Sequence, residues 1–272
     1  MAFFTFKNHQ VFYTIDGEGE PLVLLNGIMM STKSWDFAVE KVSKVIKLIR
    51  VDFFDQGQSD DYLDEPYDHN LQAELVIALL NHLNIEKAHV AGISYGGEIA
   101  VRLGIYYPER ILTLSLYNTA AYTSPWLRDI GRAWNSVGES RDGNAYYNIA
   151  IPPVYSPKFY TENNEWMENR RKILEPLFTQ EKFQGRMLRL VNSSESLDER
   201  ANVHKIEAPT LIVTSEYDFL VPKLEQELLH KNIKNSHFMI VPDFGHGWMY
   251  EDPTLFVTVL IGFVLSGGNV RV

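Results

Sequence analysis

One serine in this sequence stands where a nucleophile would stand. Ser94 lies in Gly92-Ile-Ser-Tyr-Gly96, between the apolar run 88–92, which predicts a buried strand, and a helical pattern over 97–105. A strand that turns directly into a helix strains the backbone of the turn residue, and flanking glycines remove the Cβ atoms that would collide there. The hydroxyl is then presented beside free N–H groups at a helix N-terminus, which can stabilise a negative oxygen. We therefore interpret Ser94 as a nucleophile, the alternative being a helix-capping serine.

A serine nucleophile needs an acid and a histidine, and both follow in the chain. Asp218 comes after the strand-like run 210–214, with Glu216 as the second choice of acid. His246 comes after the run 238–241 and is flanked by glycines that leave room for its imidazole to approach the serine. We expect the acid to hold the imidazole in the required tautomer and to stabilise it once it is protonated.

Other positions fit these roles less well. Asn118, at the end of the strand-like run 112–117, is not an acid, and Asp243 is too close to His246 in sequence to orient it. His89 lies inside the strand before the serine and is interpreted as a sheet residue. The sequence thus favours Ser94, Asp218 and His246 as a catalytic set.

Two backbone N–H groups are candidates for an oxyanion hole. Asn26-Gly27-Ile28 follows the strand-like run 22–25, and the N–H of Ile28 is the expected partner of the N–H of Tyr95. The alternative is a plain loop between a strand and a helix.

The composition restricts the class of protein. The chain has 272 residues, 45% of them hydrophobic, with a net charge of −10 and no cysteine. The acidity and the lack of a basic stripe argue against a nucleic-acid partner, and the lack of cysteine excludes disulfides and thiolate chemistry. The apolar run 255–265 is too short for a membrane span, and the start shows no secretory pattern, so we expect a cytoplasmic protein.

Neither a metal nor a cofactor is expected. No His-Glu-x-x-His or similar spacing is present, and Gly17-Glu-Gly19 precedes a strand instead of linking a strand to a helix. Asp52 and Asp55 lack neighbours that would complete a ligand set, so we interpret both as solvated turn residues. Nothing in the sequence indicates an oligomeric state.

Strand-like runs alternate with helical patterns over most of the chain, which predicts an α/β fold with a mainly parallel, doubly wound sheet. Residues 122–203 lack strand-like runs and carry Trp126, Trp134 and Trp166 among helical segments. We therefore expect a core of residues 1–121 and 204–272 and an inserted helical cap of residues 122–203. The cap aromatics either line an apolar pocket or fix the cap to the core.

Together these motifs resemble the α/β-hydrolase fold superfamily over nearly the whole chain, and most closely its serine esterase and enol-lactonase branch. The resemblance implies Ser94 as nucleophile, His246 as base and Asp218 as orienting acid, with Ile28 and Tyr95 supplying the oxyanion hole. Relatives usually have histidine where Asn26 stands and Arg-Gly where Phe54-Asp55 stands, so the entrance loop here is expected to differ in shape.

The predicted activity is hydrolysis of small to medium carboxylic esters or lactones through an acyl-enzyme on Ser94. The partner is a small-molecule acyl substrate, with Met29, Trp126 and Trp248 as expected substrate-binding residues. The same triad could instead serve an acyl thioesterase or a perhydrolase. A ligand-binding receptor with little turnover is the alternative from another class.

Overall fold

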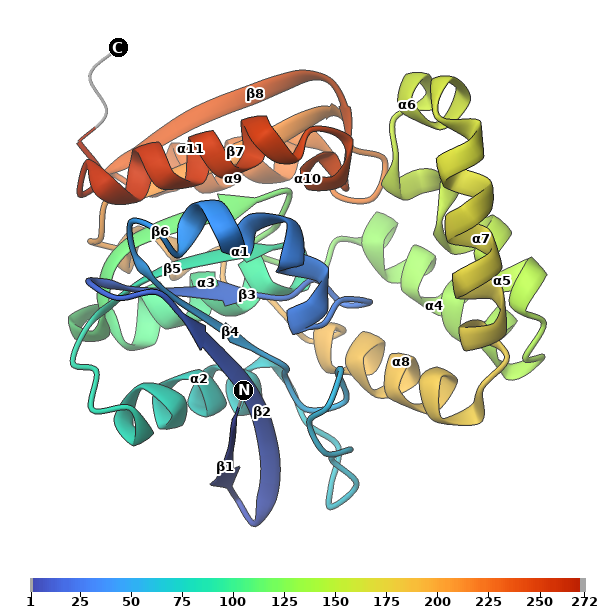
Figure 1. The fold of residues 1–272 in the computed structure, drawn as a ribbon, viewed down its shortest axis with the longest axis horizontal. Helices are drawn as coiled ribbons and strands as arrows, with labels where there is room; N and C mark the ends of the chain where they lie inside the picture. Colours follow the sequence, from blue (N-terminus) through green and yellow to red (C-terminus); the bar gives the residue numbers. More distant parts are fainter. Residues whose placement is uncertain (1, 270–272) are drawn as a thin grey trace.

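The computed structural model describes residues 2–269, in which eight strands form one sheet in the order β1-β2-β4-β3-β5-β6-β7-β8 (Figure 1). The strands are β1 (Ala2–Phe6), β2 (His9–Asp16), β3 (Pro21–Leu25), β4 (Lys47–Val51), β5 (Ala88–Ile93), β6 (Ile111–Tyr117), β7 (Thr210–Tyr217) and β8 (Ser236–Gly245). The helices are α1 (Asp36–Val42), α2 (His69–His82), α3 (Tyr95–Tyr106), α4 (Pro125–Glu139), α5 (Gly143–Ala150), α6 (Pro157–Glu162), α7 (Asn164–Phe178), α8 (Glu181–Ser194), α9 (Lys223–Asn232), α10 (Trp248–Glu251) and α11 (Pro253–Leu265).

Strands β4, β3, β5, β6, β7 and β8 pair in parallel, as the alternation of strands and helices predicts. Only β2 runs opposite to the other strands, and it pairs antiparallel with β1 on one side and with β4 on the other. The sequence reasoning missed β1, whose short Phe-rich run gains its stability by pairing with β2. Because the parallel strands share one direction, their carboxyl ends lie at one edge, where loops from distant parts of the chain meet.

Helices cover both faces of the sheet (Figure 1). The leucine stripe of α2, with residues of α3 and α9, packs on one face, where Leu75, Leu79 and Leu229 are fully buried. Helices α1 and α11 pack on the other face, with Trp35 and Phe256 fully buried between them and the sheet. The doubly wound arrangement predicted from the sequence is therefore present.

The last helix, α11, packs its apolar side chains against the sheet. It begins where the Asp252 side chain accepts a hydrogen bond from the Leu255 N–H, with Pro253 at its first position. Within residues 2–269, no helix combines the length and the apolar character that crossing a membrane requires.

Helices α4 to α8 are inserted between β6 and β7 and lie beside the sheet core (Figure 1). Ser124, Asp142 and Ser156 cap the N-termini of α4, α5 and α6 by accepting hydrogen bonds from backbone N–H groups. This part has its own apolar cluster, which includes Tyr147 and Phe178. All five helices fall inside residues 122–203, and we retain those limits as the proposed cap subdomain.

Candidate active site

Ser94 occupies the strained turn that the sequence predicts. Its φ of 54° and ψ of −123° lie far from helical and extended values, and its N–H is held by the Tyr117 carbonyl at 3.0 Å. A Cβ on Gly92 would lie 2.2 Å from the Gly96 oxygen, and one on Gly96 would lie 2.3 Å from the Leu25 oxygen. Both glycines are therefore needed for the turn to close between β5 and α3.

Asp218 and His246 are brought together as the sequence predicts. The His246 Nδ1 lies 2.8 Å from Asp218 Oδ2, and the two side chains are 8% and 0% exposed. The other oxygen, Asp218 Oδ1, accepts hydrogen bonds from the N–H groups of Leu220 and Val221 at 2.9 and 2.8 Å. Because Oδ1 is fixed in this way, Oδ2 faces the imidazole and selects the tautomer that carries its proton on Nδ1.

The alternative acids have other partners. Glu216 accepts a hydrogen bond from the Asp243 N–H at 2.9 Å, which fixes the turn where Asp243 has a φ of 66°. Asn118 donates from Nδ2 to the His246 carbonyl at 3.0 Å and to the Ser215 hydroxyl at 2.9 Å. Asn118 thus fixes the backbone of the histidine loop, a role that sequence reasoning missed.

Gly245, the glycine before His246, lies against the cap, a contact that the sequence pattern did not indicate. A Cβ on Gly245 would lie 2.4 Å from the Ser156 nitrogen and 2.5 Å from the Tyr155 carbonyl carbon, so the glycine lets the cap backbone approach the histidine loop. Glu251 joins the two segments by accepting hydrogen bonds from the N–H groups of Gly245 and Ser156 at 3.0 and 2.8 Å.

No hydrogen bond joins Ser94 directly to His246, although both residues lie within the described part of the chain. They follow β5 and β8, whose carboxyl ends lie at the same edge of the sheet. Catalytic hydrogen bonds are often long without substrate and shorten in the complex, so this arrangement is compatible with a triad.

The two expected oxyanion donors are free. The N–H groups of Ile28 and Tyr95 have no hydrogen-bond partner among the described residues. Gln56 fixes the loop that contains Gly27 and Ile28, because its Nε2 donates to the carbonyls of these two residues at 2.9 and 3.3 Å. Asn26 is fully buried and donates to Gln56 Oε1 at 3.0 Å, so it supports the loop from inside the protein.

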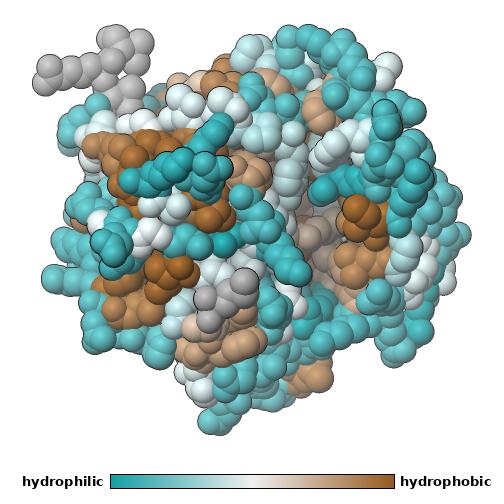
Figure 2. Space-filling view, in the orientation of Figure 1, coloured by the Kyte–Doolittle hydropathy of each residue, from teal (hydrophilic) through white to brown (hydrophobic). Residues whose placement is uncertain are grey.

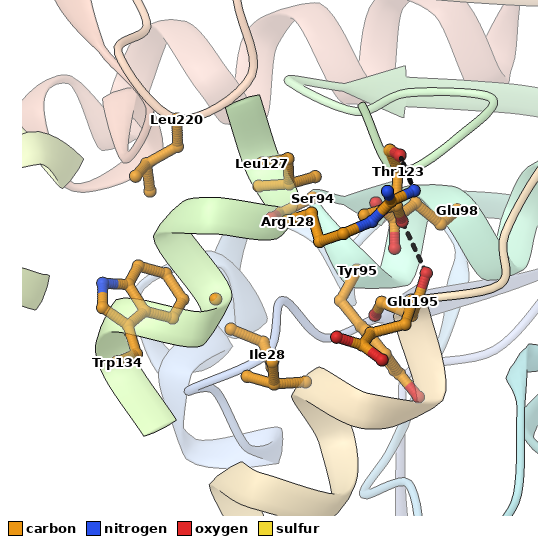
Figure 3. Close-up of a pocket in the computed structure, with 13 residues that line it drawn as sticks. Ile28, Ser94, Tyr95, Glu98, Thr123, Leu127, Arg128, Trp134, Glu195 and Leu220 are labelled. Atoms are coloured by element: carbon orange, nitrogen blue, oxygen red, sulfur yellow. Dashed lines mark hydrogen bonds between the residues drawn. The ribbon is translucent and has the colours of Figure 1, made fainter. Parts of the chain in front are cut away.

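A cavity of about 50 Å³ opens beside Ser94 (Figure 3). Ile28 and Trp134 lie on one side of Ser94 and Tyr95, while Thr123, Arg128, Glu98 and Glu195 lie on the other. The cavity therefore has an apolar half and a polar half, with the candidate nucleophile between them. Sequence reasoning named Trp134 only as one of several cap aromatics and did not identify Arg128, Glu98 or Glu195, which reach the cavity only through tertiary packing.

A larger groove of about 210 Å³ lies next to this cavity, between the Ile28–Ser31 loop and helix α8. Figure 2 shows apolar surface in the hollow between the core and the cap. Ile28 lines both the groove and the Ser94 cavity, so its side chain lies between the two spaces.

The three expected substrate-binding residues lie in different surroundings. Met29 lines the groove and not the Ser94 cavity. Trp126 is 57% exposed, and its Nε1 donates to the Phe219 carbonyl at 3.0 Å. Trp248 is fully buried and packs on Phe256 with ring centroids 5.1 Å apart. Trp126 therefore ties α4 to the loop after β7, Trp248 packs in the core, and neither residue lines the Ser94 cavity.

The description of Asp52 and Asp55 as solvated turn residues was wrong, because both are buried. Asp52 accepts hydrogen bonds from the N–H groups of Thr32 and Gln58 at 2.6 and 2.8 Å. Burial raises the pKa of Asp52, and these N–H groups oppose that rise. Asp55 pairs with Arg189 of α8, whose Nε lies 2.9 Å from Oδ1, so it links the entrance loop to the cap.

A buried polar network supports the nucleophile helix. His69 Nε2 lies 2.9 Å from Glu98 Oε2, and its Nδ1 lies 3.1 Å from the Ser193 carbonyl. The Ser193 hydroxyl donates to the Leu190 carbonyl at 2.7 Å, so Tyr95 donates to Ser193 Oγ at 2.9 Å. Burial raises the pKa of the Tyr95 hydroxyl, which keeps it a donor at ordinary pH. This network joins α2, α3 and α8 beneath the cavity.

Metal ligands do not gather at this edge of the sheet. Among residues 2–269, no group of three or more His, Asp or Glu side chains is arranged to hold a metal ion.

Comparisons with known proteins identify the fold. The sequence model described as "alpha/beta hydrolase fold" matches residues 20–253. The structure is similar to that of an alpha/beta hydrolase enzyme from a Medee basin deep-sea metagenome library, with a TM-score of 0.95, 44% identity, and coverage of 100% of this chain and 98% of the other.

Curated relatives are more distant and differ in activity. The chain is 28% identical to 3-oxoadipate enol-lactonase 1 of Acinetobacter baylyi, over 90% of this chain and 88% of the relative. It is 26% identical to a putative 2-succinyl-6-hydroxy-2,4-cyclohexadiene-1-carboxylate synthase of Bacillus subtilis, over 93% and 95% of the two chains. These matches extend over nearly the whole chain, but the relatives' names point to more than one reaction.

Proposed function

The chain belongs to the alpha/beta hydrolase fold family, and on this premise we propose that it is a serine hydrolase of small to medium carboxylic esters or lactones. The observation that carries the proposal is the strained Ser94 at a cavity, with a buried His246–Asp218 pair at the same edge of the sheet. A strained serine costs stability, and such strain persists mainly where a site depends on it.

Ser94 Oγ attacks the substrate carbonyl and passes its proton to His246 Nε2. Asp218 stabilises the imidazolium that forms, through the 2.8 Å hydrogen bond to Nδ1. The N–H groups of Ile28 and Tyr95 receive the negative oxygen of the tetrahedral intermediate. His246 then protonates the leaving group. In the second half of the reaction it takes a proton from the water that attacks the acyl-enzyme, and returns a proton to Ser94 Oγ as the carboxylic acid is released.

The cavity supports a substrate of limited size with an apolar part. Its volume is about 50 Å³, and Ile28, Trp134 and Leu220 are among its lining residues. The Acinetobacter relative is named an enol-lactonase, which supports including lactones beside open-chain esters.

The test is turnover of a panel of p-nitrophenyl esters of increasing acyl length, lactones and one acyl thioester, by wild type and Ser94→Ala. We expect wild type to hydrolyse esters or lactones and Ser94→Ala to lose about 10⁴-fold or more of kcat. Ser140→Ala is the matched control, because Ser140 is exposed and its loss should leave turnover unchanged.

Covalent labelling distinguishes a serine hydrolase from a ligand-binding receptor with little turnover. A fluorophosphonate should label Ser94 in wild type, which mass spectrometry of the labelled peptide would show. Folded wild type that neither turns over any substrate nor takes the label would contradict the proposal. Turnover of the thioester alone would reassign the chain as an acyl thioesterase.

A further inference from the structure

The polar half of the Ser94 cavity contains one cationic side chain, that of Arg128, among the described residues that line it. Arg128 lies in the first turns of α4 and extends toward Thr123, on the side of Ser94 opposite Trp134 (Figure 3). An arginine beside a candidate nucleophile is a recognition group for an anion, unless the protein already satisfies its donors.

The donors of Arg128 are largely unused. Its one hydrogen bond within residues 2–269 runs from Nη2 to the Thr123 carbonyl at 3.4 Å, which is long, and no carboxylate lies within 4.0 Å. Most other described arginines in this acidic chain have a carboxylate partner, for example Arg186 with Asp61 and Arg189 with Asp55. A guanidinium has five N–H donors, so most of those on Arg128 remain available to a ligand.

Glu98 does not neutralise this charge, because it is already paired with His69. The Ser193 carbonyl can only accept, so His69 Nδ1 donates to it. His69 Nε2 then either donates to the Glu98 carboxylate or accepts from its carboxylic acid. In both cases the His69–Glu98 pair has no net charge.

Glu195 is the second acid of the cavity, and it too has a cationic partner. Its Oε1 lies 3.6 Å from Arg132 Nε, one turn further along α4. Arg132 is shared with Asp129, whose Oδ1 lies 3.6 Å from its Nη1. The polar half therefore offers a ligand one cationic side chain, that of Arg128, beside the partly exposed carboxylate of Glu195.

We propose that the substrate carries one carboxylate, which binds Arg128 while the reacting carbonyl lies at Ser94. This inference rests on the proposed function and specifies its substrate class as an ester or lactone with a free carboxylate. A planar carboxylate matches the guanidinium fork, whereas a phosphate with two negative charges would meet one cation beside the Glu195 carboxylate. The apolar part of the substrate lies toward Trp134.

The test compares acidic and neutral esters of matched length. Mono-p-nitrophenyl glutarate is set against p-nitrophenyl pentanoate for a carboxylate on the acyl side. Acetoxyacetate is set against propyl acetate for a carboxylate on the alcohol side. In one of these two pairs, we expect the wild-type kcat/KM to be higher for the acidic ester than for the neutral ester.

Arg128→Met should lower kcat/KM for the favoured acidic ester by about tenfold or more, because a charge-assisted hydrogen bond is lost. The neutral ester should change by less than about threefold, and Arg128→Lys should restore part of the loss. Arg141→Met is the matched control, since it removes the same charge from the cap, and neither Arg141 nor its partner Glu181 lines the cavity. Arg128→Gln replaces Arg128→Met if the latter does not fold.

The outcomes separate the two proposals. If neutral esters are hydrolysed but the ratio of acidic to neutral turnover is the same in wild type and Arg128→Met, the carboxylate inference fails and the serine hydrolase stands. If Arg141→Met has the same effect as Arg128→Met, the change comes from the net charge of the protein and not from a contact in the cavity, and the inference also fails. If wild type hydrolyses nothing and is not labelled at Ser94, the proposed function itself fails.

Discussion

Replacing Asp218 by asparagine tests how the acid positions His246. In the variant, the amide oxygen can still accept from the N–H groups of Leu220 and Val221, which now bond Asp218 Oδ1 at 2.9 and 2.8 Å. The amide NH₂ group then occupies the place of Oδ2, which is 2.8 Å from His246 Nδ1. Because NH₂ only donates, Nδ1 must accept and the ring proton moves to Nε2.

An imidazole that carries its proton on Nε2 cannot take the proton of Ser94. The same change in a serine protease triad lowers kcat by about 10⁴-fold, which corresponds to about 5.4 kcal/mol of transition-state stabilisation. We expect a loss of this size here, with little change in stability because both backbone hydrogen bonds remain. Asp218→Ala should lower both kcat and the melting temperature. Two buried N–H groups lose their acceptor in this variant, which costs about 1–3 kcal/mol of folding stability for each group.

The assay is kcat for the best ester of the panel, together with thermal unfolding and ¹⁵N NMR of labelled histidine to identify the tautomer. Glu216→Gln is the matched control, because it makes the same change of carboxylate to amide two residues earlier, and its oxygen can still accept from the Asp243 N–H. The reasoning is refuted if Asp218→Asn keeps more than about a tenth of wild-type kcat, or if Glu216→Gln loses as much.

Two further substitutions test the turn and the cavity. Gly96→Ala places a Cβ 2.3 Å from the Leu25 carbonyl oxygen, so the loop that carries the Ile28 N–H must move, and kcat should fall by about 10²-fold or more. Gly262→Ala, where a Cβ meets open space in helix α11, should leave kcat unchanged, and equal kcat values for the two variants would contradict the argument. Ile28→Ala should join the cavity of about 50 Å³ to the groove of about 210 Å³, while the backbone N–H remains. The variant should therefore have its highest kcat/KM with longer acyl chains than wild type. An unchanged profile of kcat/KM against acyl length would show that Ile28 does not separate the two spaces.

The nucleophile turn could be predicted from sequence because its causes are local. The glycines around Ser94 lie within two residues of it, and the strand and helix that they join have their own apolar patterns. The same holds for the start of α11, where Asp252 and Pro253 give the cap and the first position of the helix. The acid and the histidine were predicted from their places after strands, because parallel strands bring their carboxyl ends to one edge.

Burial at that edge was not predictable from the same patterns. Asp55 resembles a solvated turn residue in sequence, yet it is buried against Arg189, 134 residues further along the chain. Trp248 lies next to the histidine loop in sequence, yet α10 turns its ring into the core beneath α11. Which side of a short segment faces the core depends on how distant helices pack. The spacing of apolar residues within the segment does not determine it.

The sequence by itself therefore determined the fold class, the strained serine and the order of the candidate triad, since these depend on glycine stereochemistry and on hydrophobic periodicity within short windows. Only the tertiary structure decided what surrounds the serine. Ile28, Arg128 and Trp134 come from two separate segments, and they meet because the cap folds over the edge of the sheet. The size and charge of the cavity follow from that packing, and with them the class of substrate that we propose.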